Sequence, residues 1–321
     1  MNMKIIYGLI ILLTIGIFTI GCTPTDGASD NQEGLTIYTS VYPIQYAVDR
    51  IGGETVTAES VYPPGVDAHT YEPTSKDMTT IADSDAFIYL GAGMEGFAET
   101  AAEALASQDV RLVEIGEHEE LFHTDEPQEH NHADESDNES HDGHNHGDHD
   151  PHIWIDPERM ADMAAIIRDE LINLNPDEEE QYNTNFNALE EDLMALDEKY
   201  TETLQAKDNK KILVSHAAYG YWEERYGIEQ IAINGLSSSS EPSQKELTQI
   251  IDQAEEHNLD YIIFEQNSSN RVSEIIQEQI GAESLTIHNL SVLTETDIEN
   301  NEDYLSLMEK NLETLDKATS K

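Results

Sequence analysis

The sequence predicts an α/β protein with two lobes, each containing a mainly parallel sheet flanked by helices, joined by one long helix. From Leu35 onward, short apolar runs alternate with amphipathic segments, which is typical of parallel strands covered by helices. The alternation occurs twice, and one long apolar stripe with helical spacing separates the two series. We therefore expect an N-terminal lobe over residues 34–174, a lobe-joining helix over 175–209 and a C-terminal lobe over 210–321.

The N-terminal lobe is predicted from short apolar runs rich in β-branched and aromatic residues, several of which end at Gly or Pro. The predicted strands are 35–40, 56–61, 86–90 and 110–115, and the predicted helices are 44–51, 76–83 and 97–105. Asp156-Pro157 begins a further helix, because Asp is a good N-cap and Pro fits the first turn.

The lobe-joining helix follows Asn175-Pro176, a second pair of cap and first-turn residues. No Gly or Pro interrupts the chain from Asp177 to Asn209. The apolar residues of the stripe recur three or four positions apart and are Tyr182, Phe186, Leu189, Leu193, Leu196, Tyr200 and Leu204. Such a helix is about 45 Å long, which exceeds the width of one small domain, so it is expected to run along both lobes.

The C-terminal lobe repeats the alternation of the first. Its predicted strands are 211–214, 228–233, 261–264 and 284–290, and its predicted helices are 243–257, 271–280 and 304–317. The helix from Ser243 follows a capping sequence, and Gly281 ends the next helix.

The N-terminus has the pattern of a secretory signal peptide over residues 1–21. Its apolar run from Ile5 to Ile20 is 16 residues long, short of the roughly 20 needed to span a bilayer. Cys22, the only cysteine, follows Gly21 as in a bacterial lipobox, where the Cys carries the lipid, although Thr19 stands where Leu is usual. Residues 22–33 are polar and are expected to form a flexible tether. We expect a lipid-anchored protein at the extracellular face of the cell membrane; the alternative is an uncleaved anchor.

The chain is strongly acidic, with 66 Asp and Glu against 16 Lys and Arg and a net charge of −50. Because polyanions repel such a surface, nucleic acid and anionic lipid headgroups are poor partners. The single cysteine excludes a disulfide within one chain.

The stretch from Leu112 to Glu158 contains no Lys or Arg and holds nine of the thirteen histidines. Tracts rich in His are typical of metal binding, and imidazole favours zinc, copper or nickel over magnesium or calcium. The candidate auxiliary metal ligands are His130, His132, His141, His144, His146 and His149. A solvated acidic loop is the alternative interpretation.

The composition of residues 118–150 cannot bury a core, so this loop is expected to lack fixed structure. Deleting residues 124–150 is therefore expected to remove weak metal binding while leaving a tight site intact.

Three histidines lie close to predicted strand ends or helix starts. His69 follows a strand and the Pro63-Pro64-Gly65 turn, His152 precedes a helix, and His216 follows the apolar core of a strand. Ligands of open parallel sheets bind beyond the carboxyl ends of the strands, so the three imidazoles are expected to converge on a metal there.

His257 and His288 do not join this set. His257 falls in a charged helix and His288 inside a predicted strand. Both are interpreted as structural.

The segments around the three histidines resemble the zinc-binding lipoproteins of bacterial ABC importers, the cluster A-I solute-binding proteins. The matching segments are Gly65-Val-Asp-Ala-His69-Thr-Tyr71-Glu72-Pro73, His152-Ile-Trp-Ile-Asp156-Pro157 and Ser215-His216-Ala-Ala-Tyr-Gly220-Tyr221. The resemblance covers the whole mature chain. It implies that His69, His152 and His216 bind Zn²⁺ between two α/β lobes. It also implies a monomer that passes the metal to the membrane permease and ATPase subunits of a zinc importer.

One position departs from the family pattern. Many relatives place an acidic ligand after the last strand of the second lobe, where this chain has Ser291. The fourth ligand is expected to be water, a carboxylate such as Glu265, or a histidine of the loop.

Three alternative functions remain open at this point. The manganese-binding relatives carry Glu where His216 stands, and a third imidazole favours zinc instead. A surface adhesin or metal buffer would depend on the His-rich loop. A zinc hydrolase could use three His and an open position, but the sequence lacks His-Glu-x-x-His, so we do not expect an enzyme.

Overall fold

The computed structural model describes residues 34–122, 149–237, 240, 242–267 and 271–320, and the chain from Gly34 onward forms one compact unit. The predicted signal peptide, Cys22, the tether and residues 123–148 of the His-rich stretch lie outside the described residues. Both ends of the predicted loop over 118–150 are described. Glu119–Leu121 form a 3-10 turn, and Asp150 contacts His152.

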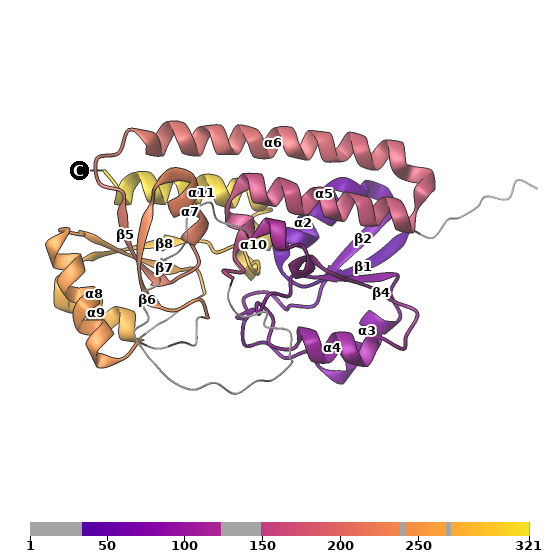
Figure 1. Ribbon diagram of the computed structural model, residues 1–321, viewed down its shortest axis with the longest axis horizontal. Coiled ribbons are helices and arrows are strands. Elements are labelled where there is room, and N and C mark those ends of the chain that lie inside the picture. Colours follow the sequence, from indigo (N-terminus) through magenta and orange to yellow (C-terminus); the bar gives the residue numbers. More distant parts are fainter. Residues whose placement is uncertain (1–33, 123–148, 238–239, 241, 268–270, 321) are drawn as a thin grey trace, which may run out of the picture. The chain divides into compact units, whose positions relative to one another are not determined.

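Two four-stranded sheets form the framework, and every pairing within them is parallel (Figure 1). The first contains β1 (Leu35–Thr39), β2 (Val56–Ser60), β3 (Ala86–Tyr89) and β4 (Arg111–Glu114), in the order β2-β1-β3-β4. The second contains β5 (Lys211–His216), β6 (Glu229–Asn234), β7 (Tyr261–Glu265) and β8 (Glu283–Ile287), in the order β6-β5-β7-β8. The same order occurs in both sheets, and the predicted α/β fold class is confirmed.

Helices connect and cover the strands. Those in the first half are α2 (Tyr42–Gly52), α3 (Ser75–Ala82), α4 (Ala98–Leu105) and α5 (Pro157–Leu174). Those from the long helix onward are α6 (Glu179–Gln205), α7 (Gly220–Tyr226), α8 (Gln244–Glu256), α9 (Arg271–Ile280), α10 (Glu295–Glu299) and α11 (Tyr304–Ala318). The helices α7 and α10 were not predicted from the sequence, because 7 and 5 residues are too few to display a helical period.

The long helix α6 runs past both sheets as one uninterrupted element of 27 residues (Figure 1). Every member of its apolar stripe is buried. Arg50 of α2 pairs with Asp192 at 2.6 Å, which ties α6 to the first sheet's helices. Tyr200 donates a hydrogen bond to the carbonyl of Met308 at 2.7 Å, which ties it to α11. The helix therefore contacts both halves of the structure, that is, the elements around the first sheet and those around the second.

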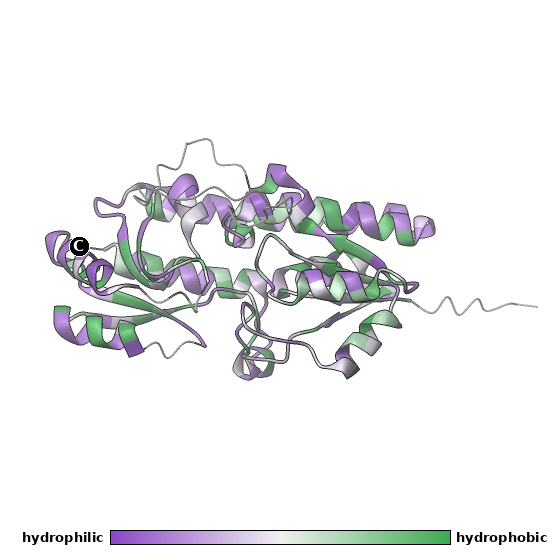
Figure 2. Cartoon of the chain, turned by 60° about the horizontal axis from the view of Figure 1, so that its bottom comes forward, coloured by the Kyte–Doolittle hydropathy of each residue, from purple (hydrophilic) through white to green (hydrophobic). Residues whose placement is uncertain are grey.

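The two tryptophans connect the halves in both directions. Trp154 lies in the 3-10 turn Ile153–Ile155 that precedes α5. It donates its indole N–H to the carbonyl of Asn289 at 2.8 Å. Trp222 of α7 donates to the carbonyl of Ile155 at 2.7 Å. Both rings are fully buried within one hydrophobic core cluster that includes residues from both sheets. Hydrophobic and hydrophilic residues alternate along the helices in Figure 2, and most of the large apolar side chains are buried.

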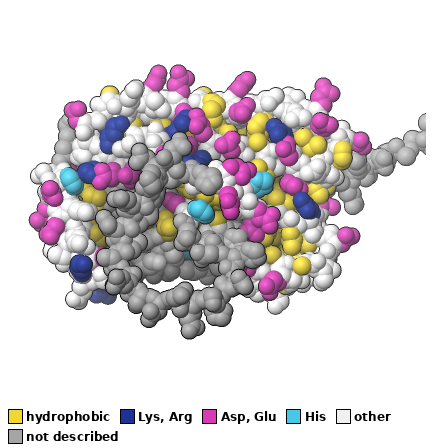
Figure 3. Space-filling model, in the orientation of Figure 1, with side chains coloured by type: hydrophobic (Ala, Val, Ile, Leu, Met, Phe, Trp, Pro, Cys, Tyr) yellow, Lys and Arg dark blue, Asp and Glu magenta, His cyan; other side chains and the backbone are white. Residues whose placement is uncertain are grey.

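The surface reflects the acidic composition. Asp and Glu side chains surround the face drawn in Figure 3, where Lys and Arg are sparse. Within the described part of the chain, no helix combines the length and apolarity needed to cross a membrane.

Candidate metal centre

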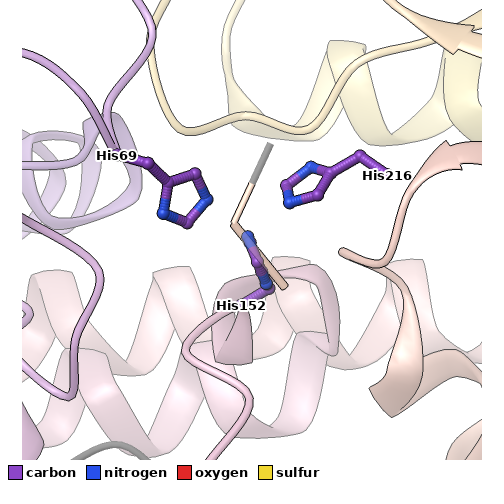
Figure 4. Close-up of side chains that lie close together, drawn as sticks. All are labelled: His69, His152 and His216. Atoms are coloured by element: carbon purple, nitrogen blue, oxygen red, sulfur yellow. The ribbon is translucent and has the colours of Figure 1, made fainter. Parts of the chain in front are cut away.

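The three predicted histidines meet in one place (Figure 4). His69 lies between β2 and α3, His152 directly precedes the 3-10 turn Ile153–Ile155, and His216 is the last residue of β5. Their ring centroids are separated by 5.4 Å for His69–His152, 5.4 Å for His69–His216 and 5.0 Å for His152–His216. One nitrogen from each ring lies within 4.8 Å of the others, and Figure 4 shows these nitrogens turned toward a common space.

Among the described residues, two of these nitrogens are buried without a hydrogen-bond partner: Nε2 of His69 and Nε2 of His152. His152 is 1% exposed and His216 is 3% exposed, so water reaches neither ring freely. Buried polar atoms are nearly always paired, because an unpaired one loses its hydration free energy without compensation. Two unpaired imidazole nitrogens aimed at the same space are the arrangement that a bound cation would satisfy.

A carboxylate stands behind each of two histidines. Nδ1 of His152 lies 2.7 Å from Oδ1 of Asp150, and Nδ1 of His216 lies 2.8 Å from Oε1 of Glu265. A carboxylate can only accept, so each Nδ1 carries a proton. This leaves Nε2 of His152 to face the common space, whereas Nε2 of His216 lies 2.8 Å from the carbonyl oxygen of Leu236. Sequence reasoning missed Asp150, whose available signal is its place two residues before His152.

The charges around the site shift two pKa values in opposite directions. Burial, followed by the neighbouring His152 and His216, lowers the pKa of His69 to about 4. Burial alone would also lower the pKa of His216. The charge and hydrogen bond of Glu265, helped by the carbonyl of Leu236, raise it instead to about 9. At neutral pH the lowered pKa favours the neutral imidazole of His69, whereas the raised pKa favours the doubly protonated, charged imidazole of His216.

The candidate fourth ligand Glu265 lies outside the group of three among the described residues. Its carboxylate accepts hydrogen bonds from Tyr219 at 3.3 Å and Asn289 at 3.0 Å, besides its contact with His216. Burial would raise its pKa, but His216 holds that pKa below its ordinary value. Glu265 is thus a hydrogen-bond partner of the candidate ligand His216. Ser291, where relatives have an acid, is buried and donates to Asn289 at 2.9 Å.

The other described histidines are not part of this group. His257 caps the end of α8. His288 lies just past β8, not inside the strand as predicted, and its Nε2 is 3.1 Å from Asp297. His149 is exposed and its ring lies 5.8 Å from that of Phe122. The other candidate auxiliary ligands lie outside the described residues.

Comparison with known proteins shows that the sequence is similar to those of zinc-uptake proteins. The family described as zinc-uptake complex component A, periplasmic (ZnuA), matches residues 37–318. The chain is 32% identical over 305 residues to the zinc-binding lipoprotein AdcA of Streptococcus pneumoniae, covering 94% of this chain and 59% of that protein. It therefore spans somewhat over half the length of AdcA. It is 27% identical over 320 residues to the high-affinity zinc uptake system protein ZnuA of Bacillus subtilis, covering 96% of each.

Solved structures show the same likeness. The Zn(II)-bound ZnuA-like domain of Streptococcus pneumoniae AdcA superposes with a TM-score of 0.71 at 30% identity, covering 90% of this chain and 100% of that one. The laminin-binding protein Lmb of Streptococcus agalactiae, described as bifunctional with adhesin and metal transporting activity, gives 0.73 at 25% identity, covering 89% of this chain and 100% of that one.

Proposed function

The chain belongs to the zinc-uptake complex component A family, and we propose that it captures extracellular Zn²⁺ between its two halves and delivers it to an ABC importer. The observation that carries this proposal is the pair of buried, unpaired Nε2 atoms of His69 and His152, facing the same space as His216. Zinc is the cargo, held by three imidazoles with water as the fourth ligand.

The choice of zinc over manganese rests on the donor atoms. The group of three contains no carboxylate, and harder oxygen ligands are what manganese prefers. Binding and release fit better than hydrolysis, because Glu265 is held by His216, Tyr219 and Asn289 and is not free to act as a general base.

The partners we propose are the membrane permease and the ATPase of the importer, with the chain acting as a monomer. Because the relative AdcA is a lipoprotein, we also propose a lipid anchor on Cys22 and a location at the extracellular face of the membrane.

Metal titration tests the proposed function. We expect one tightly bound zinc per chain in competition with a chromophoric chelator, and much weaker binding of manganese. The zinc-loaded protein should hydrolyse ester and peptide substrates no faster than buffer does. Manganese binding as tight as zinc binding, or zinc-dependent turnover, would contradict the proposal.

The pH dependence of zinc binding follows from the pKa of His216. Because this pKa is raised to about 9, the imidazole is protonated at neutral pH and donates Nε2–H to the carbonyl of Leu236 at 2.8 Å. Zinc must displace that proton, so binding at pH 7 should release about one proton from His216, and affinity should rise about tenfold per pH unit between pH 6 and 8. His69, with a pKa of about 4, adds no proton in this range.

Calorimetry in buffers of different ionisation enthalpy measures the protons released. Proton release that does not change when His216 is replaced would show that another group titrates.

The His-rich stretch is expected to supply only weak zinc sites. Because Asp150 contacts His152, the deletion that tests this should end at residue 148 and not at 150. Removing residues 124–148 is expected to leave one tight zinc and to abolish weaker equivalents, as measured by equilibrium dialysis. Loss of the tight zinc would mean that the stretch contributes an essential ligand.

A further inference from the structure

The side chain of Asp150 makes two hydrogen bonds to the metal-ligand candidate His152. Oδ1 accepts from the backbone N–H of His152 at 3.0 Å and lies 2.7 Å from its Nδ1. The side chain of Asp150 is only 18% exposed. One carboxylate oxygen thus fixes both the backbone and the ring of the same residue.

Asp150 also touches the segment that follows His216. Tyr221 donates a hydrogen bond from its hydroxyl to the carbonyl of Asp150 at 2.7 Å. A Cβ on Gly220 would lie 2.8 Å from Oδ2 of Asp150, closer than such atoms approach. Gly220 and Tyr221 begin α7, four and five residues after His216. Asp150 therefore lies between the segments that carry two of the three histidines.

We propose that Asp150 is a positioning residue for the metal site, acting through His152. By accepting Nδ1–H, it selects the tautomer in which Nε2 is unprotonated, and the second hydrogen bond fixes the direction of the ring. Its hydrogen bond from Tyr221 and its close approach to Gly220 keep the ring of His152 at a fixed position relative to His216. The proposal rests on the proposed function, since it assigns a role toward the zinc held by the three histidines.

The space beside Gly220 is needed for this position of Asp150. The absence of a side chain at Gly220 lets the carboxylate of Asp150 approach the start of α7. Gly220 needs no left-handed backbone, since it is absent from the positive-φ glycines. Its role is to leave room for Asp150, so a methyl group there should push Asp150 away from His152.

Two substitutions at different residues should therefore produce one phenotype. Asp150→Ala is expected to weaken zinc binding about 10- to 100-fold, the usual effect of removing a partner behind a metal-bound histidine. Gly220→Ala is expected to weaken it in the same direction. Asp150→Asn should fall between wild type and Asp150→Ala, because an amide oxygen can still accept Nδ1–H but carries no charge.

Nitrogen NMR of the metal-free protein gives a readout that a general loss of packing would not move. The ring nitrogens of His152 should report Nδ1–H in the wild type and a shift toward Nε2–H in Asp150→Ala. In the cobalt-substituted wild type, the visible absorption bands should have the high intensity of a tetrahedral site. Their intensity should change in Asp150→Ala and Gly220→Ala.

Two control variants separate positioning from stability. Gly52→Ala creates a similar clash, because a Cβ there would lie 2.4 Å from the side chain of Val56. Val56 is the first residue of β2, so this clash lies at the amino end of the strand. Asp177→Ala removes an exposed carboxylate before α6. Both should keep wild-type zinc affinity, with thermal unfolding recorded for every variant.

The outcomes distinguish this inference from the proposed function. A wild-type protein without tight zinc would remove the proposed function itself. Tight wild-type binding that survives in Asp150→Ala, with His152 still in the Nδ1–H form, would overturn the positioning role alone. Where Gly220→Ala fails to fold, Asp150→Asn and the NMR measurement decide the question.

Discussion

Replacing His216 by Ala is expected to weaken zinc binding by more than about 100-fold, since removing even a partner behind a ligand costs about 10- to 100-fold. His216 is the only one of the three histidines contributed by the second sheet, so its loss leaves the site with ligands from one half alone. Competition with a chromophoric chelator measures the affinity. His257→Ala, at the end of α8, is the matched control and should bind zinc as the wild type does.

The variant at His216 has a second effect that must be separated from the first. Glu265 is buried and would lose its hydrogen bond to His216, which destabilises the fold. His69→Ala avoids this, because Nε2 of His69 has no partner to leave behind. We expect His69→Ala to lose zinc with little change in the metal-free unfolding midpoint. Full zinc affinity in both variants would rule out the three-histidine site.

Replacing Trp154 by Ala is expected to lower the free energy of unfolding by about 3–5 kcal/mol, the range for removing a buried aromatic ring. The ring is fully buried, and its N–H donates to Asn289 in the other half. Urea unfolding with a chelator present measures the loss without the contribution of bound zinc.

Ile275→Ala provides the comparison for Trp154→Ala. Ile275 lies on α9 and is 53% exposed, so its truncation should change the free energy of unfolding by no more than about 0.5 kcal/mol.

Zinc affinity should also fall in Trp154→Ala, because the indole ring lies 5.4 Å from the ring of His152. An unfolding midpoint equal to that of the wild type would show that this contact between the halves contributes little.

The sequence was sufficient for the features that depend on local pattern. Short apolar runs identified all eight strands of the described residues, and the signal is clearest where the strand is buried along its length, as in Ala86–Tyr89. The stripe from Tyr182 to Leu204 identified α6, because its period repeats over many turns. The short helix α7 offers too few residues for a period, and its buried aromatic residues match a strand equally well.

For the site, the sequence determined the identity of the histidines and their places after β2, before α5 and at the end of β5. Only the tertiary structure decided which carboxylates contact the rings of His152 and His216. Glu265 is 49 residues from His216 and accepts from its Nδ1, and Tyr221 is 71 residues from the Asp150 carbonyl that it contacts. The physical reason is that the order of strands in each sheet and the packing of α6 against both halves set such distances, and neither is encoded in local periodicity.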